Sequence, residues 1–291
     1  MPWQLVIIIY IFTSNIVTAI LIKKIVSLPS KTIRQYWQYF FCVLLSLAFL
    51  IIKGGSVATP VILIIGTLGI LNSLAVFCEW RAVNISLSKT SLFAQADDIF
   101  AILLGFAFLN ELKILNPLLI AGIILCFSAA ILLLSRRSIN NGFKDGNKRL
   151  LWLILGFSFI WGLTAFLMRY FALEGVTFPV FLLGWYGGSL IGTAFIYKFK
   201  YGKRQSRALK PKEILNVFPL SFFIWVSLLL AYWVYHLAPI AIVQPIFLVT
   251  KMIFPTLVGL YFFKERKDLT SIEILAMIIG FIGGLIIALG F

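Results

Sequence analysis

Charged residues are scarce in this chain of 291 residues: they make up only 12% of it, and acids account for just 10 positions. A soluble domain of this length carries about twice that share of charge. Hydrophobic residues make up 62% of the sequence, and the mean hydropathy is +1.05. The composition therefore excludes a soluble globular domain and indicates a protein that crosses a membrane several times.

Residues and motifs of common catalytic chemistry are also missing. The chain has one histidine, and it contains no Gly-x-Ser-x-Gly, His-Glu-x-x-His or P-loop motif. One Asp-Asp pair occurs, but there is no second acidic cluster of the kind that an intramembrane enzyme binding magnesium diphosphate would need. The three cysteines lie in apolar segments, at spacings that suggest neither a metal site nor a disulfide framework. We therefore expect no enzyme activity, no cofactor and no metal.

Long apolar runs occupy most of the chain. A transmembrane helix needs about 20 apolar residues, and these runs are too long and too uniformly apolar for barrel strands. We predict an all-α polytopic membrane protein with ten transmembrane helices, at residues 3–22, 36–52, 57–78, 84–109, 115–135, 150–172, 177–197, 214–235, 239–263 and 270–290.

Basic residues gather on one side of this predicted topology. Twenty of the 25 Lys and Arg residues lie in the loops of one side, and only Lys53 and Lys113 lie in those of the other. The positive-inside rule places the basic side in the cytoplasm, so both termini would face outward. We expect a multi-pass protein of the bacterial cytoplasmic (inner) membrane whose basic loops contact lipid head groups. The net charge of +15 therefore does not predict a nucleic-acid partner.

The two halves of the chain resemble each other. GFAFLNELKIL at 105–115 matches GLYFFKERKDL at 259–269 with an offset of 154 positions, and twelve of 35 aligned residues are identical. This pattern predicts two five-helix repeats, at residues 1–137 and 150–291, joined by a basic loop at 138–149. Because five is odd, the two repeats would cross the membrane in opposite senses. In such inverted repeats the substrate site lies near the midplane, where the repeats meet.

Each predicted repeat contains an apolar helix that ends in Gly-x-x-x-x-x-Glu, followed by a closing helix rich in small residues. The residues that carry this pattern are Gly105 to Glu111 with 115–135, Gly259 to Glu265 with 270–290, and the Trp161–Gly162 pair. In these stretches the chain resembles the EamA-type members of the drug/metabolite transporter superfamily. The resemblance implies a ten-helix transporter of small organic metabolites, in which Glu111 and Glu265 are structural.

Three ionisable residues, Asp97, Asp98 and Lys251, fall near the centres of predicted helices. The repeat offset maps Asp97 onto Lys251, and equivalent positions of inverted repeats can meet at the axis between them. Each ionised group at a helix centre costs roughly 3 kcal/mol, so we predict that all three face the protein interior. We expect one aspartate to pair with Lys251 within about 4 Å and the other to face a cavity. The alternative interpretation is that all three form a static ion pair that fixes the helix at 84–109 against the helix at 239–263, and Lys89 is the alternative partner.

Other polar and aromatic residues at similar depths complete the predicted cavity. Walls of this kind suit a substrate with a flat apolar body and a polar or charged head. Asn72 also lies seven residues before Glu79, on the same helix face. We predict that the residues for substrate binding or coupling are Asp97, Asp98, Lys251, Gln95, Gln244, Asn15, Trp161, Asn72, Trp225 and Tyr232.

These features predict a secondary transporter that exports small organic metabolites, such as amino acids or amines, by alternating access. The aspartate that Lys251 does not hold would carry a proton, so the hypothesis includes proton coupling. Facilitated exchange or import without an ion is the main alternative. A membrane-embedded enzyme, a channel and a non-transporting scaffold fit the pattern less well. Gly280, Gly283 and Gly284 allow close helix packing, within a monomer or in a weak homodimer.

Overall fold

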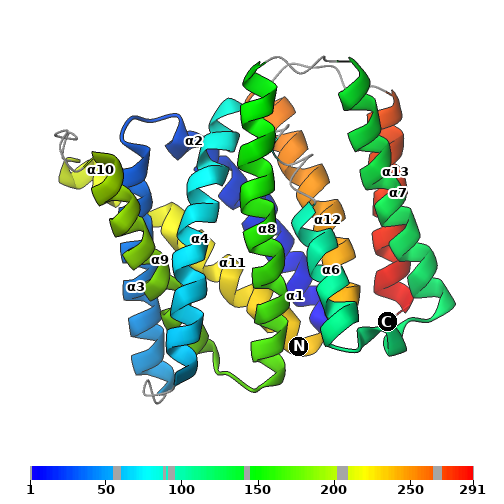
Figure 1. Cartoon of the computed structure of the whole chain (residues 1–291), viewed down its shortest axis with the longest axis horizontal. Helices are drawn as coiled ribbons and strands as arrows, with labels where there is room; N and C mark the ends of the chain where they lie inside the picture. Colours follow the sequence, from blue (N-terminus) through cyan, green and yellow to red (C-terminus); the bar gives the residue numbers. More distant parts are fainter. Residues whose placement is uncertain are drawn as a thin grey trace.

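The computed structural model describes residues 2–54, 60–87, 90, 96–140, 145–201, 209–264 and 271–290. Gln95, Lys89 and Glu265 lie outside this described part. Helices account for all of its regular structure, and they pack side by side as a bundle (Figure 1). Seven helical spans are long and apolar enough to cross a membrane, which identifies a polytopic membrane architecture. They are formed by α1 (Trp3–Tyr10) with η1 (Ile11–Thr18) and α2 (Ala19–Val26), α3 (Lys31–Lys53), α4 (Pro60–Ile85), α8 (Asp145–Leu173), α9 (Phe178–Tyr201), α10 (Pro211–Leu215) with α11 (Phe218–Leu237), and α12 (Ile240–Leu257) with η3 (Val258–Phe262).

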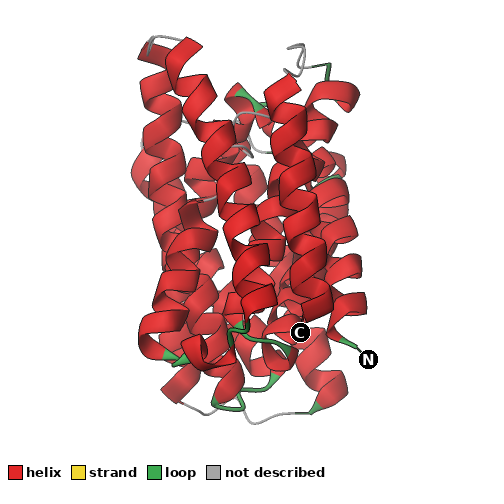
Figure 2. Cartoon of the chain, turned by 90° about the vertical axis from the view of Figure 1, so that its right-hand side faces the viewer, coloured by secondary structure: helices red, strands yellow, loops and turns green. Residues whose placement is uncertain are grey.

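Three further helices are shorter or are described over a shorter apolar stretch. They are α6 (Ala96–Phe108), α7 (Pro117–Asn140) and α13 (Ser271–Gly290), and the short η2 (Glu111–Ile114) links α6 to α7. Both chain termini lie at one end of the bundle, and α2 ends at the other (Figures 1 and 2). The basic residues Lys23, Lys24 and Lys212 lie at this second end, in the last turns of α2 and α10.

One predicted helix boundary is wrong in a way that matters for the site. The segment 57–78 was predicted to end before Glu79, but α4 continues to Ile85. No Gly or Pro interrupts residues 70–85, and Trp80 is buried among apolar neighbours. Nothing therefore breaks the helix where its composition becomes polar, and Glu79 belongs to a membrane-spanning helix. Likewise, α7 and α8 extend into the predicted loop at 138–149.

The central helix of the bundle is α12. In its apolar window 83% of the residues are buried, compared with 28–56% in the other six spans. It contacts helices from both ends of the sequence, among them η1, α6, α7 and α13. Pro255 lies within it and has no N–H, so the carbonyl of Lys251 lacks its usual helical partner. The chain then continues as the π-helical segment η3.

Small residues allow several helices to approach closely. A Cβ at Gly188 would overlap the carbonyl oxygen of Gly66, so α9 and α4 pack backbone to backbone there. A Cβ at Gly283 would lie 2.8 Å from the carbonyl oxygen of Gly122, which places α13 equally close to α7. Two of the three glycines noted in 270–290, Gly280 and Gly283, are thus used for packing within the chain, whereas nothing lies within 4 Å of a Cβ placed at Gly284.

Candidate functional site

Lys251 and two aspartates form an ion triad where α6 meets α12. The Lys251 Nζ lies 2.8 Å from Asp98 Oδ1 and 3.2 Å from Asp97 Oδ2. The Asp98 side chain is 0% exposed, whereas 27% of the Lys251 side chain is exposed. The contact between position 97 and position 251, which the repeat offset predicts, is therefore confirmed.

The prediction that only one aspartate pairs with Lys251 is wrong, although one of the two, Asp97, does line the cavity. Both carboxylates bind the same ammonium group, so neither is left unpaired. Adjacent helical residues point about 100° apart, but the long Lys251 side chain brings its ammonium group between them, and that group has three donors. Asp97 also lines the adjoining cavity, whereas Asp98 does not. The ionised triad carries a formal charge of −1, held within the protein.

Next to the triad, α8 presses closely against α6. A Cβ at Gly162 would lie 2.7 Å from the carbonyl oxygen of Asp97 and 2.9 Å from the Phe100 ring, so glycine sets this helix distance. The preceding Trp161 faces the cavity and donates a hydrogen bond from Nε1 to Asn72 Oδ1 at 3.1 Å. The Trp161–Gly162 pair thus fixes the position of Asp97 on one side and part of the cavity wall on the other.

A cavity of about 300 Å³ lies beside the triad. Residues from the first and second halves of the sequence line it, on helices that include η1, α4, α8 and α12. Six of the predicted site residues line it, namely Asn15, Asn72, Asp97, Trp161, Gln244 and Lys251.

Asn15 reaches the cavity from a local irregularity of the first span. The segment η1 is π-helical, and Thr18 Oγ1 donates to the carbonyl of Thr13, five residues earlier, at 2.8 Å. Asn15 is 3% exposed, and its Nδ2 donates to Thr250 Oγ1 on α12 at 3.1 Å. Single π turns often occur at functional sites. Here the π turn brings a buried amide against the central helix, one residue from Lys251.

Asn72 lines the cavity, but its amide group is committed to the protein. Its Nδ2 donates to Tyr39 Oη and to Ser189 Oγ, both at 3.1 Å, and its Oδ1 accepts from Trp161. Both amide hydrogens are therefore used. The network joins α3, α4, α8 and α9, so the main effect of Asn72 is to hold the cavity wall together.

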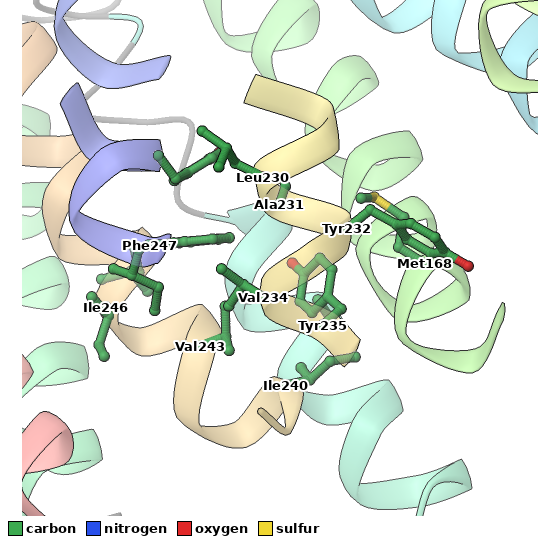
Figure 3. Close-up of a cluster of buried hydrophobic side chains, with 14 of the residues drawn as sticks. Met168, Leu230, Ala231, Tyr232, Val234, Tyr235, Ile240, Val243, Ile246 and Phe247 are labelled. Atoms are coloured by element: carbon green, nitrogen blue, oxygen red, sulfur yellow. The ribbon is translucent and has the colours of Figure 1, made fainter. Parts of the chain in front are cut away.

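Besides Asp98, two described residues of the predicted site do not line the cavity. Trp225 donates from Nε1 to Ser46 Oγ at 3.0 Å and packs edge-on against Phe49, which joins α11 to α3. The Tyr232 hydroxyl donates to the carbonyl of Val176 at 2.7 Å. Figure 3 shows Tyr232 on the side of α11 that faces Met168, away from Leu230 and Val234. Trp225 and Tyr232 were wrongly predicted to line the cavity, because the sequence of a helix that is apolar on every face does not show which face lines the cavity. Gln95 lies outside the described residues.

Sequence reasoning missed several residues of the cavity wall. Glu79 had been noted only for its spacing from Asn72, yet it lines the cavity from α4. Gln38 does so from α3, and Ser14 from η1. Gln38 lies near the start of the predicted segment 36–52, where a polar residue is expected to face the membrane interface. The sequence did contain a signal for two of these residues, because Glu79 and Gln38 are polar residues within otherwise apolar runs.

Glu111 and Arg169 hold the start of α12 in place. Glu111 accepts hydrogen bonds from the N–H groups of Ile240 at 3.1 Å and Ala241 at 2.9 Å, the first residues of α12. Arg169 Nε lies 3.5 Å from Glu111 Oε1, and Arg169 Nη1 donates to the carbonyl of Tyr235. A carboxylate satisfies the free N–H groups of a helix N-terminus and complements its dipole. This geometry gives Glu111 a structural role, while Glu265 lies outside the described residues.

Comparisons with known proteins identify the fold alone. No protein-family model and no curated protein matches the sequence. Among solved structures, 26 chains match. One of them, described only as the crystal structure of a protein, is similar over 96% of this chain and 100% of its own length, with a TM-score of 0.67 and 14% sequence identity. The arrangement of helices therefore also occurs in a solved protein, and the functional argument depends on the site.

Proposed function

We propose that this chain is a secondary transporter that moves small organic solutes by alternating access around the cavity beside the ion triad. One observation carries this proposal: a cavity of about 300 Å³ within the helix bundle, lined by Glu79, Asp97 and Lys251. Ionisable residues at membrane depth are costly, and they mark substrate or ion pathways. A chain that needed only to be anchored or to act as a scaffold would have no use for them.

Contacts between helices support the two predicted repeats of an inverted, ten-span transporter. Helices at equivalent positions of the repeats pack on each other, α6 against α12 and α7 against α13. Asp97 and Lys251, which are 154 positions apart, are in contact. The same offset separates Cys126 from Gly280, whose carbonyl accepts a hydrogen bond from the Cys126 thiol at 3.8 Å. Equivalent residues meet in this way when they lie near an axis that relates two repeats, as in transporters of this type.

The resemblance to EamA-type transporters and the basic loops extend the proposal to export across a bacterial inner membrane, with both termini outside. The triad removes the reason for assigning proton carriage to Asp97 or Asp98, since Lys251 holds both. Facilitated exchange without an ion is therefore the simpler form of the mechanism. The described residues contain no group of three or more His, Cys, Asp or Glu that could hold a metal ion.

Counterflow in liposomes tests the proposal. Purified protein is reconstituted into liposomes loaded with one unlabelled solute class at a time: amines, amino acids, nucleosides or organic acids. We expect one class to drive uptake of its labelled member faster than protein-free liposomes do. Adding a pH gradient separates proton-coupled export, which responds to the gradient, from facilitated exchange, which does not. Absence of counterflow with every class, from protein that is folded by its thermal unfolding profile, would contradict the proposal.

A further inference from the structure

The cavity contains a carboxylate that the triad does not neutralise. Glu79 lines it from α4, and its side chain makes no hydrogen bond or ion pair with any residue that the structure describes. The nearby Arg81 is directed elsewhere, with its guanidinium 3.9 Å from the centre of the Phe77 ring. Glu79 is half-buried and lines the cavity, so its carboxyl group can contact a molecule that occupies the cavity.

The other charges of the site disfavour an anion. Among the described residues that line the cavity, Lys251 is the only lysine or arginine, and two aspartates already hold its ammonium group. With Glu79 ionised, the four groups have a formal charge of −2. A substrate carboxylate would have to displace an aspartate from Lys251 while approaching this negative charge, which costs several kcal/mol where like charges are brought together.

Three unsatisfied acceptors in the cavity also favour a cation, although one donor there, Trp80 Nε1, is buried without a partner among the described residues as well. Asp97 Oδ1 and the side-chain oxygens of Gln38 and Gln244 are buried without a hydrogen-bond partner among the described residues. All three residues line the cavity. Acceptors left unsatisfied in a buried site are costly, and a ligand that brings donors, such as an ammonium group, satisfies them.

Aromatic rings supply the apolar part of the site. Trp161 and Trp185 line the cavity together with Tyr10 and Phe247, whose rings stack with centroids 4.3 Å apart. Aromatic faces attract cations, more strongly where water is excluded. The volume of about 300 Å³ is at the small end of the range for ligand pockets, which favours a compact molecule.

We propose that the cavity binds a small organic cation, an amine with an apolar body, and that Glu79 is the counter-ion of its ammonium group. This inference rests on the proposed transport function and narrows it from organic solutes to monovalent amines. The triad and Glu79 then have separate roles: the triad joins α6 to α12, and Glu79 selects the charge of the substrate.

Three probes that share one ring and differ in charge test the proposal. They are 2-phenylethylamine, a cation at neutral pH; phenylalanine, a zwitterion; and 3-phenylpropionate, an anion. Binding to the purified full chain is measured by titration calorimetry at pH 7. We expect 2-phenylethylamine to bind at least about tenfold more tightly than either of the other two, as the loss of one charged hydrogen bond implies. Equal or tighter binding of the zwitterion or the anion would overturn the proposal, and so would no binding of the amine at millimolar concentration.

Variants connect this preference to Glu79. We expect Glu79→Gln to weaken amine binding at least about tenfold, Glu79→Asp to restore part of it, and Glu174→Gln to leave it unchanged. Glu174 is an exposed acid outside the cavity, so it controls for the loss of one negative charge. If Glu79→Gln folds normally and binds the amine as tightly as the unchanged protein, Glu79 is not the counter-ion.

Flux measurements separate this inference from the function on which it rests. Glu79-dependent binding of the amine without counterflow in liposomes would contradict transport and leave the cation site standing. Counterflow of phenylalanine or 3-phenylpropionate without binding of the amine would support transport and overturn the cation site.

Discussion

The two acidic regions of the cavity differ in how their charge is compensated. Asp97 and Asp98 share the ammonium of Lys251 at 3.2 and 2.8 Å, whereas Glu79 has no such partner within the described residues. The triad joins two helices and borders the cavity through Asp97 and Lys251, whereas Glu79 lies on the cavity wall without joining helices in the described part of the chain. A paired buried charge mainly affects how the helices are held, and an unpaired one is available to a ligand. The comparison therefore separates charges that support the fold from a charge that can recognise a substrate.

Removing the base should produce the largest effect on stability. Lys251→Met would leave two adjacent buried carboxylates without their counter-charge. We expect a loss of about 3–5 kcal/mol in the free energy of unfolding, the usual cost of breaking a buried pair from one side. Titration of the purified protein from mild detergent into SDS measures this loss.

The matched control for this variant carries Lys251→Met together with Asp97→Asn and Asp98→Asn, so that no charge remains in the triad. We expect it to recover most of the lost stability, because a neutral site no longer contains an unpaired charge. If it is as unstable as Lys251→Met alone, the loss comes from packing of the lysine side chain and not from its charge.

A variant of Glu111 tests whether removing another acid that is paired within the fold also lowers the free energy of unfolding. Glu111→Ala would expose two N–H groups at the start of α12 and leave Arg169 without its partner. We expect a loss of about 2–3 kcal/mol in unfolding free energy. The same SDS titration measures it, with exposed Glu174→Ala as the control. Equal stability of the two variants would contradict the capping role.

Disturbing the contact between α8 and α6 should produce the next largest loss of stability. A methyl group at Gly162 would meet the backbone of Asp97, so we expect Gly162→Ala to cost about 1–3 kcal/mol through overpacking. Gly187→Ala is the matched control, since nothing lies within 4 Å of a Cβ there. A small change at both positions would show that α8 does not determine the position of Asp97.

Neutralising Glu79 should change stability least. Because this carboxylate has no partner to lose, we expect Glu79→Gln to alter the unfolding free energy by less than about 1 kcal/mol. Thermal unfolding of the ligand-free protein checks this expectation. A loss as large as that of Lys251→Met would place Glu79 with the structural charges and remove the distinction between the two regions.

The helical membrane class and the contact between positions 97 and 251 could be predicted from the sequence, because apolar length and the repeat offset are read directly from it. The pairing of both aspartates with one lysine could not, since it depends on how far a flexible side chain extends. The spacing of Glu79 from Asn72 places both on one helix face, but the predicted segment 57–78 ends too early, because no Gly or Pro between 70 and 85 breaks α4. Trp225 and Tyr232 face other helices, and uniformly apolar segments do not show which face meets the cavity.

Accessibility of Ser14 from each side of the membrane tests the central claim most directly, since this residue lines the cavity and is half-buried. Ser14→Cys is made in a chain whose native Cys42, Cys78 and Cys126 are replaced by Ala. A membrane-impermeant maleimide is then applied to right-side-out and to inside-out vesicles. The account predicts labelling from both sides, slowed by 2-phenylethylamine and not by 3-phenylpropionate. Labelling from one side only, unaffected by either compound, would contradict alternating access around this cavity.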